Sequence, residues 1–281
     1  MKLGEWTLDL VTDGLFGLDG GAMYGVVPRP LWEKKTPPDS RNRIRMAMNC
    51  WLLRGRGETV LIETGAGEKW DAKHAEIYNF ERENRLLSNL HARGVRPEDV
   101  SLVINTHLHF DHCGWNTRRD TDPGRAVPTF PNARYIVQRG ELDHARGPNE
   151  RDRASYLPEN FAPIAEAGLW RTVEGDASLL AGLDLVVMPG HTRDMQCVKI
   201  SGDGQTAFLL ADLVPMRAHL AYPWIMSYDL YPMTTLENKK KWLPRLAREG
   251  WICLFGHDPD VPAAHLVQRD DKFETEPVPL D

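Results

Sequence analysis

Side chains that bind divalent metals are concentrated in one short run of the chain, His107-Leu108-His109-Phe110-Asp111-His112. The run follows residues 102–106, an apolar stretch with the composition of a β-strand, so it stands where a strand ends and a loop begins. Proteins of the α/β class place much of their chemistry at such positions. Few structural requirements would gather three histidines and an aspartate there, and the run therefore predicts a metal site.

The spacing within the run indicates which side chains can bind the same ion. In extended backbone, residues two apart point to the same side, so His107 and His109 can present their imidazoles to one ion. If the chain then turns into a helix, Asp111 and His112 face a neighbouring position, which suggests two adjoining sites. Imidazole and carboxylate ligands suit zinc, and also manganese, iron or cobalt, while the lack of thiolates argues against a closed structural zinc site.

Three further metal-binding residues each follow an apolar, strand-like run: His191, Asp212 and His257. With the first run they give seven candidate ligands, five histidines and two aspartates. The isolated histidines are predicted to be surface residues or packed core residues instead: His74, His91, His144, His219 and His265.

The run 107–112, followed by His191, Asp212 and His257 in that order and at those intervals, resembles the motif of the metallo-β-lactamase superfamily. The resemblance spans residues 48–258. It implies an α/β fold, a four-layer αββα sandwich with a two-metal site at one edge. It also implies the ligand sets: His107, His109 and His191 for the first ion, Asp111, His112 and His257 for the second, and Asp212 between the two.

Length and composition limit the remaining possibilities. The chain of 281 residues is long enough for one large domain or two small ones, and we expect a single domain over 1–281 because the ligands must converge. A net charge of −6 gives no support for nucleic-acid binding. The N-terminus has no apolar core of signal-peptide length, and no stretch approaches the roughly 20 apolar residues of a membrane span. We therefore expect a cytoplasmic protein that acts on a small molecule.

Four cysteines, Cys50, Cys113, Cys197 and Cys253, lie far apart without paired spacing and are predicted to be buried, reduced thiols. Cys113 directly follows the metal run. On a starting helix it should point away from the ions.

Two halves of the chain have a similar plan. Residues 48–54 and 59–62 predict a hairpin, followed by a helix near 81–93 and the strand before His107. Residues 195–200 and 206–210 predict a second hairpin, followed by a helix from about residue 236. The repetition is consistent with two βα halves, related by a pseudo-twofold axis and packed sheet to sheet.

The predicted helix from about residue 236 shows further sequence features. Thr234 with Glu237 three residues later predicts a capping box, and Pro244 predicts a kink. The run Lys239-Lys240-Lys241 predicts a solvated face.

Three segments, 13–35, 140–169 and 219–233, are predicted to be lids or insertions around the site. Their apolar and aromatic residues predict a substrate pocket beside the metals, for which the candidates are Phe16, Met23, Tyr24, Tyr222 and Trp224. Two alternatives are core packing under long loops and a contact in a homodimer. Glu63 stands where the superfamily usually has an aspartate that supports the metal loop, and it is either such a support or a turn residue.

The predicted chemistry is hydrolysis of an activated ester-like bond. Two divalent ions about 3.5–4 Å apart can bind a bridging hydroxide and lower the pKa of water toward about 7. One ion also polarises the scissile carbonyl or phosphoryl oxygen. Asp111 is the predicted catalytic residue that orients the hydroxide and passes its proton to the leaving group.

Within the superfamily, the chain most resembles lactonases that open acyl-homoserine lactones, related carboxylesterases and organophosphate hydrolases such as methyl parathion hydrolase. Residues 20–32 and 211–220 resemble the last group, which implies organophosphate hydrolysis as a side activity. The lactonases place a tyrosine shortly after the bridging aspartate, whereas this chain reads Asp212-Leu213-Val214-Pro215. Tyr222 or Tyr24 are the candidates to replace it.

Other activities stay open as alternatives. A redox enzyme with a single iron, similar to persulfide dioxygenases, would carry a similar motif. A thioester hydrolase similar to β-lactamases or glyoxalase II is disfavoured. The β-lactamases of the superfamily lack an aspartate at the position of Asp212, and glyoxalase II has an additional C-terminal domain. A non-catalytic scaffold is the weakest alternative, since no candidate ligand is missing.

Overall fold

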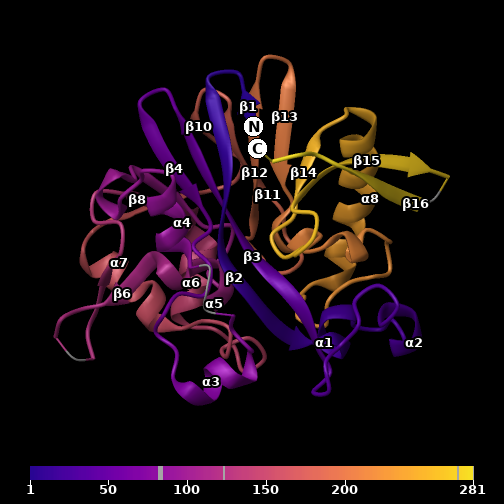
Figure 1. Cartoon of the computed structure of the whole chain (residues 1–281), viewed down its shortest axis with the longest axis horizontal. Coiled ribbons are helices and arrows are strands. Elements are labelled where there is room, and N and C mark those ends of the chain that lie inside the picture. The colour runs from indigo at the N-terminus through magenta and orange to yellow at the C-terminus, as the bar shows by residue number, and fades with distance from the viewer. Residues whose placement is uncertain (82–84, 123, 271, 281) are drawn as a thin grey trace.

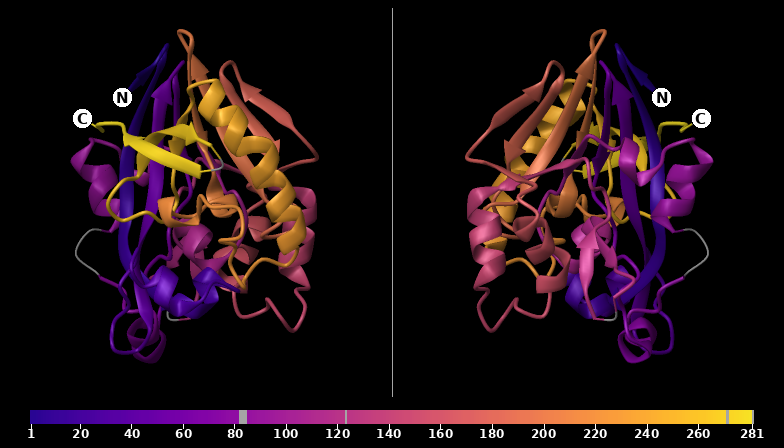
Figure 2. Two further views of the ribbon diagram at one scale, coloured as in Figure 1. Left: turned by 90° about the vertical axis from the view of Figure 1, so that its right-hand side faces the viewer. Right: turned by 90° about the vertical axis from the view of Figure 1, so that its left-hand side faces the viewer.

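The computed structural model describes residues 1–81, 85–122, 124–270 and 272–280. Within these residues, two seven-stranded sheets pack face to face and carry helices on their outer sides (Figure 1 and Figure 2). The predicted αββα sandwich is therefore confirmed.

The first sheet has the order β1-β2-β3-β4-β5-β8-β9. Its strands are β1 (Lys2–Leu3), β2 (Trp6–Asp19), β3 (Arg43–Gly55), β4 (Glu58–Ile62), β5 (Leu102–Ile104), β8 (Arg134–Gln138) and β9 (Trp170–Val173). Neighbours from β1 to β4 are antiparallel, and neighbours from β4 to β9 are parallel. The parallel strands therefore direct their carboxyl ends to the same edge of the sheet.

The second sheet has the order β10-β11-β12-β13-β14-β15-β16. Its strands are β10 (Ala177–Leu180), β11 (Leu183–Val187), β12 (Gln196–Gly202), β13 (Gln205–Leu209), β14 (Ile252–Leu254), β15 (Ala263–Arg269) and β16 (Lys272–Pro277). β13 and β14 are parallel, and the other neighbours are antiparallel. A small separate ribbon joins β6 (Thr117–Arg119) to β7 (Ala126–Pro128).

The helices cover the outer faces of the sheets and their loop edge. They are α1 (Gly20–Tyr24), α2 (Arg29–Trp32), α3 (Ala72–Ile77), α4 (Leu86–Ala92), α5 (Phe110–Cys113), α6 (Arg139–Arg146), α7 (Ala162–Glu166) and α8 (Pro232–Arg248). α8 lies along the outside of the second sheet (Figure 2), where Trp242 stacks on Phe208 of β13. On the first sheet, Leu86 and Leu90 of α4 pack against the outward residues of β3 and β4.

The main core lies between the two sheets. Trp51 and Leu53 of β3 face Val198 and Ile200 of β12, and all four are fully buried. Helices cover the other side of the central strands, so these strands have apolar residues on both faces. This is why β3 reads as a nearly continuous apolar run rather than an alternating one.

Both predicted hairpins are confirmed. β3 and β4 pair as far as Gly55 and Glu58, and β12 and β13 pair as far as Gly202 and Gln205. Each turn has two residues with positive φ, at 54° and 80° for Arg56 and Gly57 and at 50° and 76° for Asp203 and Gly204. Two such residues match the twist of adjacent antiparallel strands, so the turns fix the register.

Two predicted helix boundaries were wrong. Glu81 does not begin a helix, because it bridges to Leu15, and α4 begins at Leu86; the predicted residues 82–84 lie outside the described part of the chain. α8 begins at Pro232, so Thr234 lies inside the helix and makes no capping box. Proline is favoured at a first helical position because it has no N–H to leave unpaired. Pro244 does lie inside this helix, as expected.

The lysine run of α8 is not a uniformly solvated face, which corrects the prediction. Lys239 is fully buried. Its ammonium group donates to the carbonyl oxygens of His219, Ala221 and Trp224 at 2.7, 2.6 and 3.0 Å, and to that of Tyr222 at 3.3 Å. The buried charge is therefore compensated by backbone dipoles of the preceding loop.

All four cysteines are free and buried, as predicted. Cys113 directs its Sγ to the carbonyl oxygen of Leu108 at 3.3 Å and packs with Val137 and Leu142. It therefore belongs to the core behind the metal run.

The three segments predicted as lids connect strands and helices of the sandwich, and Ile164 of the second segment packs on the outer face of the first sheet. Residues 13–19 complete β2 and lead into α1 and α2, residues 140–169 include α6 and α7, and residues 219–233 lead from β13 to α8. Their action as lids remains a prediction. No helix in the described residues is long and apolar enough to cross a bilayer.

Candidate metal centre

All seven predicted ligands come together at one edge of the sandwich. They follow the ends of β5, β11, β13 and β14, which lie in two different sheets. Three groups of ligand atoms each lie within 4.8 Å of one another: His107, His109 and His191; His107, His112 and Asp212; and Asp111, His112 and His257. All seven side chains are buried.

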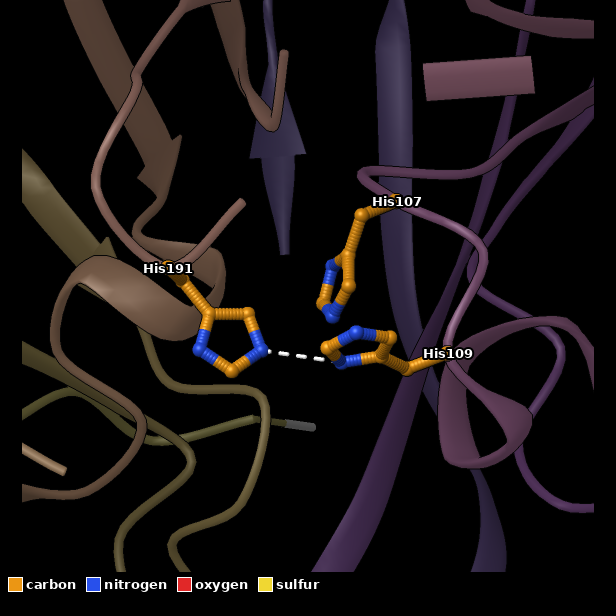
Figure 3. Close-up of side chains that lie close together, drawn as sticks. All are labelled: His107, His109 and His191. Carbon is orange, nitrogen blue, oxygen red and sulfur yellow. Dashed lines mark hydrogen bonds between the residues drawn. The ribbon is translucent and has the colours of Figure 1, made fainter. Parts of the chain in front are cut away.

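The first group joins the loop after β5 to the turn after β11. Nε2 of His191 lies 2.9 Å from Nδ1 of His109, and the His107 ring stands above this pair (Figure 3). The His107 ring centroid is 4.6 Å from that of His109 and 4.9 Å from that of His191. Three imidazoles from distant parts of the chain therefore converge on one point, which is a suitable geometry for one ion.

The second group adds two residues of α5 to a residue that follows β14. Nε2 of His257 lies 3.1 Å from Nε2 of His112. Oδ2 of Asp111 lies 3.8 Å from the His112 nitrogen and 3.7 Å from the His257 nitrogen. Two imidazoles and a carboxylate thus surround a second point beside the first.

Asp212 stands between the two groups. Its Oδ2 lies 3.3 Å from Nε2 of His191, in the first group. Its Oδ1 lies 3.3 Å from Nε2 of His257 and 3.6 Å from Nε2 of His112, in the second group. The two oxygens of one carboxylate are therefore divided between the two sets of histidines.

Two carboxylates lie beside the outward ring nitrogens of two predicted ligands, His112 and His191. Nδ1 of His112 lies 3.3 Å from Oε2 of Glu63, whose Oε1 accepts a hydrogen bond of 2.8 Å from the backbone N–H of Thr106. Nδ1 of His191 lies 3.0 Å from Oδ1 of Asp229. Carboxylates in this position fix the ring and the tautomer of a metal-binding histidine. Glu63 therefore supports the metal loop, in spite of its extra methylene group.

Neutral oxygen atoms lie beside the outward ring nitrogens of two other histidines. Nδ1 of His257 lies 2.8 Å from the carbonyl oxygen of Ala47, to which it can only donate. Nδ1 of His107 lies 2.9 Å from Oγ1 of Thr106. With the proton on Nδ1, each ring has its Nε2 lone pair free and directed into the centre.

A buried glutamate, Glu141 of α6, links the two ligand loops. It accepts hydrogen bonds from the backbone N–H of Leu108 at 2.9 Å, from Oγ1 of Thr192 at 2.7 Å and from the hydroxyl of Tyr156 at 3.0 Å. Leu108 lies between two predicted ligands, and Thr192 directly follows His191. Neither Glu141 nor Asp229 was predicted from the sequence, because neither belongs to a recognisable sequence pattern.

The charges around the centre suit ligands of a cation. Burial, together with the neighbouring histidines, holds the pKa of His107 and His109 well below the usual value, so both rings are neutral. Burial opposes ionisation of Asp212, but His112, His191 and His257 outweigh it and hold the pKa of that carboxyl well below its usual range. Neutral imidazole and ionised carboxylate are the forms that bind metals.

Unsatisfied atoms at the centre also fit a cation. His107 Nε2 and Asp212 Oδ1 are buried without a hydrogen-bond partner. Burial opposes the charged form of His112, yet Asp111, Asp212 and Glu63 raise the pKa of His112 well above its usual value. Negative charge is thus in local excess beside ligand atoms that lack a partner. Divalent cations would neutralise that charge and bind those atoms.

A cavity of about 180 Å³ opens onto the centre. Asp111, Asp212 and three of the histidines form its base. The other residues that line it are Leu18, Met23, Met46, Tyr78, Phe110, Arg151, Ala154, Ser155, Met226 and Tyr228. A mainly apolar wall with a few polar groups, next to a group of candidate metal ligands, is typical of a site for a small molecule.

The predicted pocket residues need correction. Met23 lines the cavity, but Phe16 does not: its ring stacks on Phe80, and its centroid is 5.6 Å from that of His257. Tyr24 is fully buried because its ring stacks between Trp32 and His219, and its hydroxyl accepts a 2.8 Å hydrogen bond from Thr36.

The other two aromatic candidates do not line the cavity either. The Tyr222 ring packs edge-on against Phe273 of β16, and the Trp224 ring packs edge-on against Tyr24. These contacts favour the alternative of packing under long loops for these residues. Tyr78, Arg151 and Tyr228 line the cavity but were not among the predicted pocket residues, because their approach to the metal run depends on how the loops fold over it.

Residues 45–257 match the family model of the metallo-beta-lactamase superfamily, which is most of the chain. The chain belongs to the metallo-beta-lactamase superfamily. The predicted family and the predicted metal-dependent hydrolase are thereby confirmed.

This superfamily member is 28% identical over 233 residues to the N-acyl homoserine lactonase of Bacillus cereus, a match that covers 77% of this chain and 83% of that one. It resembles the crystal structure of a probable metal-dependent hydrolase from Staphylococcus aureus with a TM-score of 0.89 and 26% identity over 98% of this chain and 99% of that chain. The dizinc quorum-quenching lactonase AidC, solved with a product, shares the fold at a TM-score of 0.82 and 22% identity over 99% of this chain and 96% of that one.

Proposed function

We propose that this superfamily member is a dinuclear metal-dependent hydrolase that opens the rings of lactones with an apolar portion. The observation that carries the proposal is the division of the Asp212 carboxylate between His191 on one side and His112 and His257 on the other. A residue in that position can bridge two ions. The N-acyl homoserine lactonase relatives support lactones as the substrate class.

The proposed ligands are those of the sequence analysis: His107, His109 and His191 for one ion, Asp111, His112 and His257 for the other, with Asp212 shared. Two bound divalent ions, for which we propose zinc, would activate water as a nucleophile and polarise the scissile carbonyl. Manganese, cobalt and iron suit the same donor atoms.

Asp111 is the proposed catalytic residue. Its carboxylate lines the cavity and also lies near the ligand nitrogens of His112 and His257, so it stands between the centre and a bound substrate. From there it can orient the attacking water and carry a proton to the alkoxide that leaves when the ring opens. Asp212 and the histidines of the ligand groups would hold the two ions.

Tyr228 is the proposed donor to the substrate carbonyl, in place of Tyr222 and Tyr24. It lines the cavity, whereas the other two tyrosines pack elsewhere. Burial, with a contribution from Asp19, raises the pKa of Tyr228 to about 12, so its hydroxyl stays neutral and can donate at neutral pH. Tyr228 precedes Asp229, and the link from Asp229 to His191 ties the backbone beside Tyr228 to the centre.

The experiment is a substrate panel with defined metal content. Purified protein loaded with zinc, manganese or cobalt is tested on γ- and δ-lactones with acyl chains and on aryl esters, with elemental analysis of the same samples. We expect acid release from lactones and close to two ions per chain. Protein with two ions bound and no turnover across the panel would contradict the proposal. A single iron together with oxygen uptake on a persulfide substrate would favour the redox alternative.

A further inference from the structure

Arg151 is the only arginine or lysine among the described residues that line the cavity over the candidate metal centre. The other ionisable groups there are the aspartates and histidines of the proposed ligand set and the two tyrosines. The cavity thus has candidate metal sites at its base, apolar walls and one permanent positive charge.

The guanidinium group of Arg151 is hydrogen-bonded to the segment that contributes Met226 and Tyr228 to the cavity wall. Its Nη2 donates a 2.6 Å hydrogen bond to the carbonyl oxygen of Ser227, in the segment 219–233. The backbone N–H of Ser227 in turn donates to the carbonyl oxygen of Ala22 in α1 at 2.8 Å. Arg151 therefore reaches from one wall of the cavity to the opposite one.

The loop that carries Arg151 is itself anchored to the metal run. The buried side chain of Asp152 lies 2.6 Å from Nε2 of His144 in α6. The carbonyl oxygen of Ser155 accepts a 2.9 Å hydrogen bond from the N–H of Phe110, which begins α5 and precedes Asp111. Short hydrogen bonds thus set the position of the loop that carries Arg151 relative to the centre.

Most of the donor capacity of Arg151 remains open. A guanidinium group has five N–H donors, and one of them goes to Ser227. In the part of the chain that the structure describes, no carboxylate forms an ion pair with Arg151, although several other exposed arginines have one, such as Arg139 with Glu174. Such a planar fork matches the two oxygens of a carboxylate.

Resting on the proposed function, we infer that Arg151 is a specificity-determining residue that binds a carboxylate on the substrate, at the end remote from the scissile bond. The ester or lactone carbonyl lies at the metal centre, an apolar linker lies along Met23, Met46 and Met226, and the acidic end reaches Arg151. The enzyme thereby prefers acidic esters and lactones over neutral ones of the same length.

The test uses mono-p-nitrophenyl esters of aliphatic dicarboxylic acids of increasing length, and the methyl esters of the same compounds as neutral controls. In the metal-loaded wild type we expect kcat/KM to be about tenfold higher for the acid than for its methyl ester, mainly through KM, because a charge-assisted hydrogen bond is lost in the latter. The preference should peak at one chain length, since the distance from the centre to Arg151 is fixed.

Three variants separate recognition from a structural role. Arg151→Gln should lower kcat/KM for the acid to the level of its methyl ester and leave the methyl ester within about twofold. Arg151→Lys should keep part of the preference, because the charge remains. Arg153→Gln, an exposed arginine of the same loop that does not line the cavity, should behave as the wild type. Equal losses on both substrates in Arg151→Gln, or no loss, would overturn the inference.

The proposed function and this inference fail in different ways. If the wild type with two bound ions hydrolyses no ester or lactone, the proposed function fails. The inference is then judged by calorimetric titration with monomethyl adipate. Binding that is lost in Arg151→Gln and kept in Arg153→Gln supports it, and no binding, or equal binding to all three proteins, overturns it.

Discussion

Nδ1 of His191 lies 3.0 Å from Oδ1 of Asp229, and Nε2 of the same ring faces the candidate metal centre. The other carboxylate oxygen of Asp229 accepts a 2.6 Å hydrogen bond from Oγ1 of Thr235 in the first turn of α8. All three side chains are buried. This connection ties a proposed ligand of the first ion to the longest helix, although the residues involved lie 38 positions apart.

We predict that Asp229→Asn weakens metal binding about 10- to 100-fold without unfolding the protein, because the amide keeps the size of the side chain but loses the charge that orients His191. Competition with a chromogenic chelator measures the affinity. Asp143→Asn, at an exposed ion pair of α6, is the control and should bind metal as the wild type does. Wild-type affinity in Asp229→Asn would contradict the orienting role.

Asp212→Ala should reduce the metal content from close to two ions toward one per chain and lower hydrolysis by at least about a hundredfold. The reason is that the two ligand groups share this carboxylate. Elemental analysis and the lactone assay check both effects. Asp203→Asn, in the turn between β12 and β13, is the control. Two ions and full activity in Asp212→Ala would exclude the bridging role.

Tyr228→Phe should lower kcat/KM for lactones about tenfold and leave the metal content unchanged, since the variant loses one hydrogen bond to the substrate carbonyl. Tyr222→Phe should leave kcat unchanged, because that ring packs against Phe273 away from the cavity. Steady-state kinetics on one lactone measures kcat and kcat/KM for both variants. An unchanged rate in Tyr228→Phe together with a loss in Tyr222→Phe would reverse the assignment.

Lys239→Met should lower the free energy of unfolding by about 2–4 kcal/mol, because buried carbonyl oxygens of the 219–224 loop lose their donor. Urea denaturation measures this. Lys240→Met is the control on the exposed face of the same helix and should change stability by no more than about 0.5 kcal/mol. Similar stabilities of the two variants would show that the carbonyl contacts contribute little.

The stability of the protein should depend on pH through His219. Burial lowers the pKa of His219 to about 3 in the folded protein, against a usual value of 6.5. Between these values the unfolded chain binds the extra proton, so the contribution of His219 to stability falls as the pH drops from about 6.5 toward 3.

His219→Phe tests this contribution, since a phenyl ring can still stack on Tyr24 but cannot take a proton. At pH 8 the variant should be less stable by about 1 kcal/mol, because it loses the hydrogen bond to the carbonyl oxygen of Met23. At pH 5 the variant should become the more stable protein, since titration costs the wild type about 2 kcal/mol there. Urea denaturation at both pH values measures the difference, and a constant difference would contradict the pKa shift.

The sequence by itself determined both hairpins and the seven residues that converge at the centre, and the resemblance of those seven residues to a family motif implied the fold class. Strand composition and two-residue turns are local properties, and the metal-binding residues directly follow strands whose ends meet at one edge. A short spacing such as that of His107 and His109 is therefore enough to indicate a shared position.

Tertiary structure decided what surrounds those residues. Asp229, Glu141 and Lys239 show no local pattern, because their partners come from other elements and their direction depends on long-range packing. The same holds for the cavity wall, where Tyr24 packs into the core and Tyr228 and Arg151 line the cavity. Loop side chains follow the contacts of the folded chain rather than a backbone period, so the residues proposed to select the substrate emerged only when the loops were placed over the metal run.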